Sequence, residues 1–594
     1  MNREEARKAA EQAALQSYLN CYIRETGTGK FTADAPSELA SVHFGLWLHL
    51  TLKKKQEELY IPVDYVSETG RHLFNHAVYY QSEKIDFLAF AEKTLDELNT
   101  GEKDGKKNDL LERISQSCKL MAEFIYERSA DEEELYKTDF QFLEAEQALL
   151  FGHLLHPAPK SREGMSDEDI RTYSPELKGT FPLHYFRAPA NLVYSRSLLP
   201  HSAIQQIKKM VIDDPEISEA FKSKYAQEDG YALLPLHPWQ AHYVLQDAEV
   251  RKLADQGILE NLGQHGRAYY ATSSLRTVYH PDVPFMLKFS LNIKITNSVR
   301  TNLMKELERG AEVKALMETR LGQEMADKFP NFSFVHDPAF LTLKLPDRNE
   351  TGFEVILREN PFYGENANQA AAVVSLCQDG LKRGSSRLSS VIRNLAAAEK
   401  RSLNEVSEKW LKKYLAISMK PVLWLYLEKG IALEAHQQNS IVQLKGGYPE
   451  RFYYRDNQGF YFTESRKTLL ESYLAGAGKK SETLCSDAVA DERLSYYFFF
   501  NHLFGLVNAF GMAGLADERS LLQIIREEME GWEVSEDHPS QLIKNFLEKE
   551  NLPCKANLMT GYHDLDELVG PLETQSVYVN VANPLLKKEA VASS

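Results

Sequence analysis

The sequence has few of the features that mark several common protein classes. Its 594 residues include only five cysteines, which lie far apart and form no CxxC pair. This spacing indicates neither a zinc site nor a disulfide framework, and it is typical of a reducing compartment such as the cytoplasm. No run approaches the ~18 apolar residues of a membrane span. The charged N-terminus, MNREEARKAAEQ, is unlike a signal peptide.

Positive charge is also scarce. The chain has 69 Lys and Arg against 85 Asp and Glu, which gives a net charge of −16 and argues against nucleic acid as the main partner. There is no GxGxxG or Walker A phosphate loop, no internal repeat and no convincing nucleophilic triad. The hydrophobic content of 43% is ordinary for a globular protein. At about 150 residues per domain, the length suggests two to four domains.

The most informative stretch is RAYYATSSLRTVYHPDVPFMLKFSLNIKITNSVRTN, residues 267–302. From Phe285 to Thr296, apolar and polar residues alternate, apart from Met286, which predicts a strand with one buried face. The aromatic run before it is joined by a His-Pro-Asp-Val-Pro turn signal. The sequence therefore predicts an antiparallel hairpin.

This hairpin brings cations together. A fold about Pro281 and Asp282 places Arg276 roughly opposite Lys288, and such a pair destabilises a sheet unless an anion lies between the two. After Thr296 the pattern looks helical, which would put Arg300 in a first helical turn, where an anion is also favoured. The alternative is an ordinary solvated sheet face with scattered basic residues.

A basic loop follows a helix that the pattern Thr138-x-x-Gln141 caps. The loop, GHLLHPAPKSREG at 152–164, contains His156, Lys160 and Arg162 among glycines and prolines. Phosphate or carboxylate binding and a plain surface loop both explain it. His237, beside Trp239 at the start of a helix with proline at its first position, is better explained as a packed structural histidine.

Farther along, helical patterns dominate. They cover 366–380, 387–400 and 403–428, after an antiparallel α+β middle third. A β-like insertion follows, in which the residues Glu434, His436 and Asn439 face Asp456 across a turn. Carboxylate and amide oxygens are the hard ligands that Mg²⁺ uses with nucleotide phosphates. A charged loop at 99–109 and an irregular tail after 558 complete the expected organisation.

These motifs form an ordered series. Together they resemble the motifs of the IucA/IucC family of NRPS-independent siderophore synthetases, over nearly the whole chain. The motifs are GHLLHPAPKSREG, LLPLHPWQ, SSLRT, KFSLNIKITNSVRTN, EAHQQNS, YRDNQG and CKANL. Within that family the sequence is most similar to the petrobactin-type members that join citrate to spermidine.

The resemblance implies an α+β fold shaped as a cupped hand. Its three parts are a helical thumb-like region at 1–165, a fingers-like nucleotide-binding region with a central antiparallel sheet at 166–365, and a mostly helical palm-like region with a β insertion at 366–594. It also implies a cytoplasmic homodimer and an ATP- and Mg²⁺-dependent, AMP-forming ligase. Such a ligase adenylates a carboxylate of citrate and passes it to a polyamine, and it needs neither membrane nor nucleic acid.

The resemblance further implies roles for individual residues. Contacts to ATP are implied for His156, Ser274, Arg276, Lys288, Asn439 and Asp456. Contacts to citrate are implied for Thr296, Arg300, His436 and Lys555. Magnesium ligands are implied at Glu434, Asn439 and Asp456. The catalytic group by this match is Arg276, Lys288, Arg300 and His436, and Lys160 and Arg162 are second candidates.

Two questions stay open in the sequence. The acyl donor is either free citrate or a mono-substituted citrate, and the nucleophile is a spermidine-like polyamine, a diaminopropane-type amine or a hydroxylated amine. A different class of activity, a kinase-like phosphotransferase, is suggested faintly by His436-x-x-Asn439 followed by Asp456. Kinases place an Asp base between that His and Asn, where this chain has Gln437 and Gln438.

Overall fold

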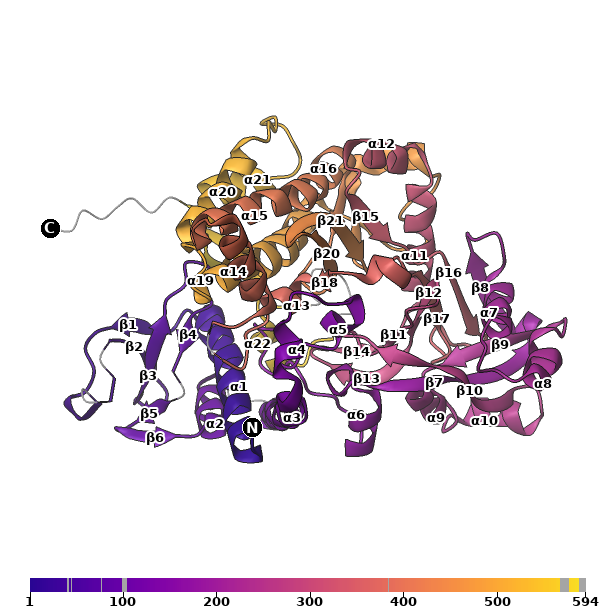
Figure 1. The fold of residues 1–594 in the computed structure, drawn as a ribbon, viewed down its shortest axis with the longest axis horizontal. Helices are drawn as coiled ribbons and strands as arrows, with labels where there is room; N and C mark the ends of the chain where they lie inside the picture. Colours follow the sequence, from indigo (N-terminus) through magenta and orange to yellow (C-terminus); the bar gives the residue numbers. More distant parts are fainter. Residues whose placement is uncertain are drawn as a thin grey trace.

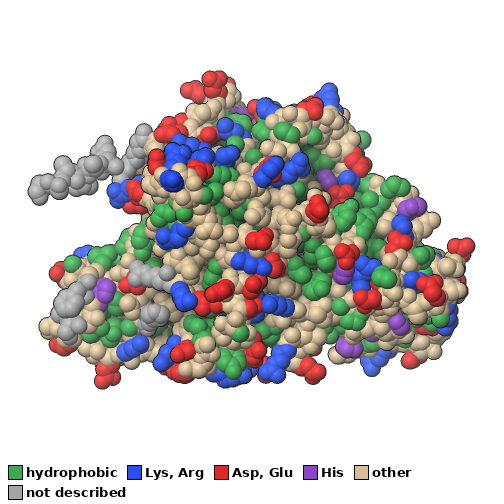
Figure 2. Space-filling view, in the orientation of Figure 1, with side chains coloured by type: hydrophobic (Ala, Val, Ile, Leu, Met, Phe, Trp, Pro, Cys, Tyr) green, Lys and Arg blue, Asp and Glu red, His purple; other side chains and the backbone are tan. Residues whose placement is uncertain are grey.

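The computed structural model describes residues 1–39, 42–43, 45–75, 77–98, 104–382, 384–566 and 576–586. Helices and mainly antiparallel sheets form three masses, as the α+β expectation requires: the N-terminal part at the lower left of Figure 1, the middle of the chain at the lower right and the C-terminal part at the top. On the face in Figure 2, acidic and basic side chains are interspersed, so the net negative charge is not gathered into one patch there. None of the helices in the described ranges combines the length and apolar character that a membrane crossing needs.

The N-terminal mass is built on α1 (Arg3–Thr26), which lies in the region expected to be helical. Asn2 and Glu5 form its capping box, and Gly27 ends it in the left-handed region at φ 63°. It packs against α2 (Phe87–Leu98) and α3 (Asp104–Arg128). Of the loop expected at 99–109, residues 104–109 therefore belong to α3, and 99–103 lie outside the described residues.

A six-stranded sheet, absent from the sequence-based prediction, completes this mass. Its path is β1-β2-β3-β5-β6, with β4 paired to β3. The strands are β1 (Lys30–Thr32), β2 (Leu46–Leu52), β3 (Glu57–Tyr65), β4 (Leu73–Phe74), β5 (Val78–Tyr80) and β6 (Glu83–Ile85). The short helices α4 (Glu132–Tyr136), α5 (Phe142–Glu146) and α6 (Asp167–Tyr173) follow. The capping box of α5 joins Gln141 to Glu144, so the predicted Thr138 cap was wrong.

The middle of the chain forms an eight-stranded sheet whose pairings are all antiparallel, as predicted. Its order is β8-β16-β17-β12-β11-β10-β7-β9. The strands are β7 (Thr180–Pro189), β8 (Val193–Ser197), β9 (Tyr231–Leu236), β10 (Glu260–Ala271), β11 (Thr277–Tyr279), β12 (Phe285–Phe289), β16 (Ala339–Leu343) and β17 (Val355–Glu359). The accompanying helices are α7 (Ala203–Ile212), α8 (Glu219–Phe221), α9 (Pro238–Val244) and α10 (Ala248–Asp255).

The predicted hairpin exists, with a register one residue from the expected one. Thr277, rather than Arg276, lies opposite Lys288. The long strand is also broken at Ser290, after which β13 (Leu291–Ile295) leaves the sheet and pairs with β14 (Ser298–Arg300). Ser290 is fully buried, and its hydroxyl donates to Glu354 Oε2 at 2.6 Å. This buried polar contact ends β12 where alternation alone predicted continuation.

The helix expected from 298 starts later. Arg300 lies in β14, and α11 (Met304–Met317) begins four residues beyond it, followed by α12 (Arg320–Lys328). The reason is tertiary: the carbonyls of Arg300 and Thr301 accept hydrogen bonds from the buried Arg276 guanidinium, at 3.2 and 2.7 Å. The prediction of Arg300 in a first helical turn was therefore wrong.

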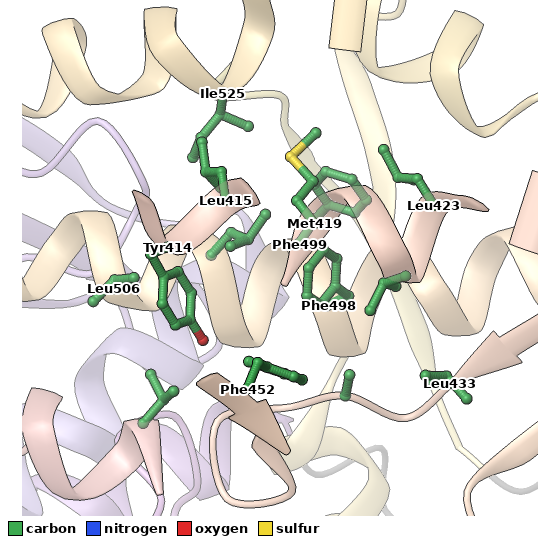
Figure 3. Close-up of a cluster of buried hydrophobic side chains, with 14 of the residues drawn as sticks. Tyr414, Leu415, Met419, Leu423, Leu433, Phe452, Phe498, Phe499, Leu506 and Ile525 are labelled. Carbon is green, nitrogen blue, oxygen red and sulfur yellow. The ribbon is translucent and has the colours of Figure 1, made fainter. Parts of the chain in front are cut away.

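The C-terminal mass is mainly helical around the largest hydrophobic core. Figure 3 shows Tyr414 and Leu415 packed near Phe498, Phe499 and Ile525. The helices are α13 (Val373–Cys377), α14 (Arg387–Glu399), α15 (Leu403–Ile417), α16 (Met419–Lys429), α17 (Lys467–Tyr473), α18 (Asp487–Leu494), α19 (Phe504–Met512), α20 (Glu518–Glu530) and α21 (Leu542–Glu548). The helix expected at 366–380 is instead β18 (Ala370–Ala372) leading into α13.

The predicted β insertion lies against this core. A four-stranded sheet joins β15 (Phe332–Val335), β21 (Tyr448–Arg455), β20 (Ser440–Lys445) and β18, and a three-stranded sheet joins β19 (Ile431–Leu433), β22 (Phe460–Thr463) and β23 (Leu484–Cys485).

The tail is ordered rather than irregular where it is described. It contains β24 (Asn551–Lys555), α22 (Asn557–Tyr562) and β25 (Tyr578–Ala582), and β25 pairs with β24. Leu558 and Tyr562 of α22 join the N-terminal hydrophobic core, and α22 lies beside α1 (Figure 1).

Candidate functional site

One cavity of about 730 Å³ lies where the three masses meet. Twelve Lys and Arg residues line it against six Asp and Glu residues, whereas the whole chain carries a net charge of −16. Basic residues are therefore in excess around this cavity although acidic residues are in excess in the whole chain, and this favours anionic ligands. All eleven residues singled out in the sequence line this cavity: His156, Ser274, Arg276, Lys288, Thr296, Arg300, Glu434, His436, Asn439, Asp456 and Lys555.

Some of the residues that line the cavity have a strained backbone. Leu275, Thr296 and Asp456 all have positive φ angles, at 65°, 57° and 89°, although none is glycine. For a β-branched residue such as Thr296 this conformation is a genuine outlier. Strained residues persist where surrounding contacts over-determine them, and they cluster at functional sites.

Arg276 and Lys288 form the cationic floor. The Arg276 side chain, 6% exposed, donates only to neutral oxygens: the carbonyls of Arg300 and Thr301, Asn302 Oδ1 at 3.0 Å and Gln458 Oε1 at 3.1 Å. Lys288 Nζ donates to the same Gln458 oxygen at 2.6 Å. Burial lowers the pKa of Arg276 to about 10 and that of Lys288 to about 8. An anion placed here would relieve this electrostatic cost.

Asp456 and Arg358 complete the floor. Asp456 Oδ1 lies 2.8 Å from Lys288 Nζ and 3.6 Å from Arg358 Nη2, while Arg358 forms a second ion pair with the buried Asp337. Although burial alone would raise the pKa of Asp456, Lys288 and Arg358 hold it well below its ordinary value. Its side chain is still 26% exposed to the cavity, so the carboxylate can meet a ligand or metal while staying ionised.

The tight turn between β13 and β14 forms a second wall. Arg300 Nη2 donates to the carbonyl of Ile295 at 2.8 Å and to Thr296 Oγ1 at 2.7 Å, so the strained turn and the guanidinium brace each other. The next residue of the turn, Asn297, brings its Oδ1 to 3.3 Å from His156 Nε2. The turn therefore connects the 152–164 loop to the hairpin.

The loops after β19 and β21 form the third wall. The amide of Glu434 donates to the Gly459 carbonyl at 2.9 Å, and the Arg455 amide donates to the Asn439 carbonyl at 2.9 Å. A Cβ on Gly459 would lie 2.7 Å from the Cβ of Glu434, so glycine is needed for this approach. The two loops are thus hydrogen-bonded to each other and pack in direct contact.

The side chains on these loops have unusual protonation. Burial raises the pKa of the Glu434 carboxyl, to which Tyr461 donates a hydrogen bond, and the charge of Asp456 adds to this effect. Burial lowers the pKa of His436 to about 3, so its imidazole is neutral at physiological pH. A neutral imidazole can accept a hydrogen bond from a ligand as well as donate one.

A metal would meet oxygen donors here. The described residues contain no group of three or more His, Cys, Asp and Glu arranged to hold a metal by themselves. Magnesium commonly uses one or two carboxylates and completes its shell with water and substrate phosphates. Glu434 and Asp456, which repel each other across the cavity, fit that smaller donor set.

The far end of the cavity is aromatic and basic. Lys555 Nζ lies 5.7 Å and 5.6 Å from the ring centroids of Tyr496 and Tyr497. These tyrosines belong to a π-helical segment, Ser495–Leu503, of the kind that often occurs at functional sites. Arg493 Nη1 donates to the hydroxyl of Tyr578 at 3.0 Å on the same side.

The second candidates of the basic loop have a structural role. Lys160 and Arg162 both pair with the buried carboxylate of Glu176, so both side chains are held by a partner within the protein. His237 caps α9 and packs against Tyr173 and Phe181, which confirms the interpretation of a structural histidine.

The sequence reasoning missed three further residues that line the cavity, namely Gln458, Arg358 and Arg309. Gln458 bridges Arg276 and Lys288, and Arg309 Nη2 donates to the Ser481 carbonyl at 3.0 Å beside them. Gln458 stands in the motif YRDNQG, where it could have been found. Arg358 directly follows the apolar run VIL of a strand, and a basic residue in that place was the available signal.

Fold and cavity together define an α+β protein whose central cavity is lined by twice as many basic as acidic residues. Comparison with known proteins is more specific. The sequence profile of the IucA/IucC family matches residues 141–378, and one described as ferric iron reductase FhuF-like transporter matches residues 408–570. The chain is 46% identical to a spermidine-citrate ligase of Bacillus anthracis, across 99% of this chain and 100% of that one. The chain therefore belongs to the IucA/IucC family.

Two further similarities extend over the whole chain. A rhizobactin siderophore biosynthesis protein of Rhizobium meliloti, RhbC, is 38% identical across 98% of both chains. The structure of ATP-bound aerobactin synthetase IucA from Klebsiella pneumoniae superposes with a TM-score of 0.87 at 27% identity, and the match covers 97% of this chain and 100% of that one. The α+β architecture is thus that of the family.

Proposed function

We propose that this protein is an ATP-dependent, AMP-forming ligase that adenylates a carboxylate of citrate and joins it to a spermidine-like polyamine through an amide bond. The observation that carries this proposal is the concentration of twelve basic residues in one cavity of an acidic protein. ATP and citrate bring roughly six to seven negative charges, and at ~4 Å each charge pair is worth about 4 kcal/mol at an effective dielectric of 20. The similarity to a spermidine-citrate ligase supports the choice of substrates.

The floor of the cavity suits the triphosphate. We assign Ser274, Arg276 and Lys288 to its oxygens, with His156, Asn439 and Asp456 at the edges of the same site. A citrate carboxylate oxygen attacks the α-phosphorus, the bond to the bridging oxygen breaks, and pyrophosphate leaves. The chemistry requires positioning and stabilisation of developing charge rather than a protein nucleophile. Because Arg276 has no carboxylate partner among the described residues, its charge is available for this task.

The second wall and the aromatic end suit citrate. We assign Thr296, Arg300, His436 and Lys555 to its carboxylates and hydroxyl. Arg300 is already oriented by the Thr296 hydroxyl, so little side-chain entropy remains to be lost on binding. In the second half-reaction the amine nitrogen attacks the citryl carbonyl carbon, AMP leaves and the amine loses a proton.

Magnesium fits the same proposal as a partner of the nucleotide. Glu434, Asn439 and Asp456 would supply the protein oxygens, of which Asp456 is kept ionised by Lys288 and Arg358. When bound, the metal would neutralise charge on the phosphates during transfer.

A kinase-like reaction is not supported by the 436–439 loop. Gln437 Nε2 donates to the His502 carbonyl at 3.3 Å, and Gln438 Nε2 donates to Ser273 Oγ at 3.4 Å. Neither side chain can act as the Asp base that a kinase places between this His and Asn.

Several finer assignments belong to the same proposal. One assignment divides the chain into a thumb-like region at 1–165, a fingers-like region at 166–365 and a palm-like region at 366–594. It is supported by the three largest hydrophobic cores, which follow these regions approximately but cross their limits. A cytoplasmic location is supported by five free cysteines. A homodimer follows the family resemblance, and light scattering tests it.

The experiment that tests the activity is an amine screen. The protein, ATP, Mg²⁺ and citrate are incubated with spermidine, diaminopropane-type amines and hydroxylated amines, and products are identified by mass. We expect a citrate–polyamine amide together with AMP and pyrophosphate. Parallel reactions with mono-substituted citrate identify the acyl donor. Formation of ADP, or ATP hydrolysis without an amide in every reaction, would contradict the proposal.

A further inference from the structure

The cavity depends on a short segment near the end of the chain. Lys555, at the end of β24, and Asn557, at the start of α22, both line the cavity. Asn557 Nδ2 donates to the Leu155 carbonyl at 2.7 Å and to the Tyr496 hydroxyl at 3.0 Å. The segment therefore contacts the 152–164 loop and the aromatic end of the site at once.

A carboxylate from the opposite end of the chain holds this segment. Glu25, in the last turn of α1, is only 8% exposed. Its Oε1 accepts from the Leu558 amide at 2.9 Å, and its Oε2 accepts from the Met559 amide at 2.8 Å. Both oxygens are thus used on the first turn of α22, three and four residues after Lys555.

The other end of α22 is fixed by α3. Arg113 Nη2 donates to the Gly561 carbonyl at 3.0 Å, and Lys106 Nζ donates to the His563 carbonyl at 2.7 Å. A Cβ on Gly561 would lie 3.2 Å from Asn297 Oδ1, so α22 also abuts the turn that carries Thr296. The N-terminal helices thereby fix α22 against two walls of the cavity.

We infer that Glu25 is a positioning residue for citrate binding: it holds the α22 segment so that Lys555 is directed into the cavity. This inference rests on the proposed function, in which Lys555 contacts citrate. Glu25 itself touches no substrate. Its loss frees the start of α22, and the Lys555 ammonium then occupies its working position for only part of the time.

The test is a double-mutant cycle on citrate KM, with kcat and thermal unfolding measured in parallel. We expect Glu25→Ala to raise citrate KM about tenfold, the size of a lost pair of buried hydrogen bonds to backbone amides, and to change kcat and ATP KM much less. Glu25→Gln, which keeps one acceptor oxygen, should give an intermediate KM and provides the measurement if the alanine variant does not fold. In a Lys555→Ala background, Glu25→Ala should change citrate KM less than about twofold, because the two act through one contact.

Asp247→Ala is the matched control. Asp247 Oδ1 likewise accepts from two helix amides, those of Glu249 and Val250, but α10 lies outside the cavity. This variant should lose stability and keep its citrate KM. An increase in KM that is as large in the Lys555→Ala background as in the wild type would overturn the positioning role and leave that of Lys555 intact. A Lys555→Ala variant with unchanged citrate KM would overturn both.

Discussion

Gln458 offers the sharpest perturbation of the phosphate site. Its Oε1 lies 2.6 Å from Lys288 Nζ and 3.1 Å from Arg276 Nη2, and the side chain is 8% exposed. Gln458→Glu changes the shape little and places a negative charge between the two cations. At ~3 Å each attraction is worth about 5 kcal/mol at an effective dielectric of 20. Repulsion from Asp456 offsets one of the two, since its carboxylate shares Lys288.

A nucleotide phosphate must then compete with the built-in carboxylate. We expect a net loss of about 5 kcal/mol in ATP affinity, the one attraction that is not offset, which is on the order of several thousandfold in Kd. Gln458→Met is the matched control, because it has similar length and no charge. It removes the two hydrogen bonds that Oε1 accepts and the one that Nε2 donates to Asn302 Oδ1. It should therefore lower Tm, yet leave ATP affinity equal to or higher than that of the wild type.

Calorimetric ATP titration and thermal unfolding of both variants provide the assay. The variant with Glu should also have a Tm at or above that of the variant with Met, because its cations keep partners. If both variants bind ATP equally well, the triphosphate does not contact Arg276 and Lys288, and the assignment of the cavity floor is wrong.

Three further predictions concern the cavity cations Arg276, Lys288 and Arg300. Arg276→Ala and Lys288→Ala should each cost ~2–4 kcal/mol of transition-state stabilisation in adenylation. Lys344→Ala, beside the same sheet but outside the cavity, is the control and should leave the adenylation rate unchanged. Pyrophosphate release at the wild-type rate in either site variant would refute the roles of Arg276 and Lys288. Arg300→Ala should raise citrate KM with little change in ATP KM, and an unchanged citrate KM counts against its role. Burial lowers the pKa of Lys288 to about 8, and a bound phosphate raises this pKa again, so ATP binding near pH 8.5 should take up a proton. Calorimetry in two buffers of different ionisation enthalpy measures this proton uptake. Lys288→Arg should abolish the buffer dependence of the binding enthalpy.

Sequence patterns predicted local structure where one periodicity ran uninterrupted. The alternation around Phe285–Ile295 correctly indicated β structure, because side chains on alternate faces meet different environments. It did not show that Ser290 divides the run between two sheets, since that depends on a bond to Glu354, 64 residues away. Similarly, the late start of α11 depends on Arg276, whose guanidinium uses carbonyls that a longer helix would need.

Charge partners were the least predictable feature of the site. Lys160 and Lys288 look alike in the sequence as basic residues in ordered motifs. Lys160 pairs with Glu176, whereas Lys288 pairs with Asp456, which lies 168 residues further along the chain. These contacts between residues that are distant in the sequence decide which cations can reach a ligand. They form only when the chain folds, so the sequence alone does not reveal them. Family motifs located the wall residues, and the structure distinguished structural cations from those facing the cavity.

The most direct measurement is exchange of labelled pyrophosphate into ATP with no amine present. A protein that forms a citryl adenylate in this cavity should catalyse exchange only when citrate is added, and Lys288→Ala should abolish it. Exchange that does not depend on citrate, or formation of ADP without any exchange, would contradict the account.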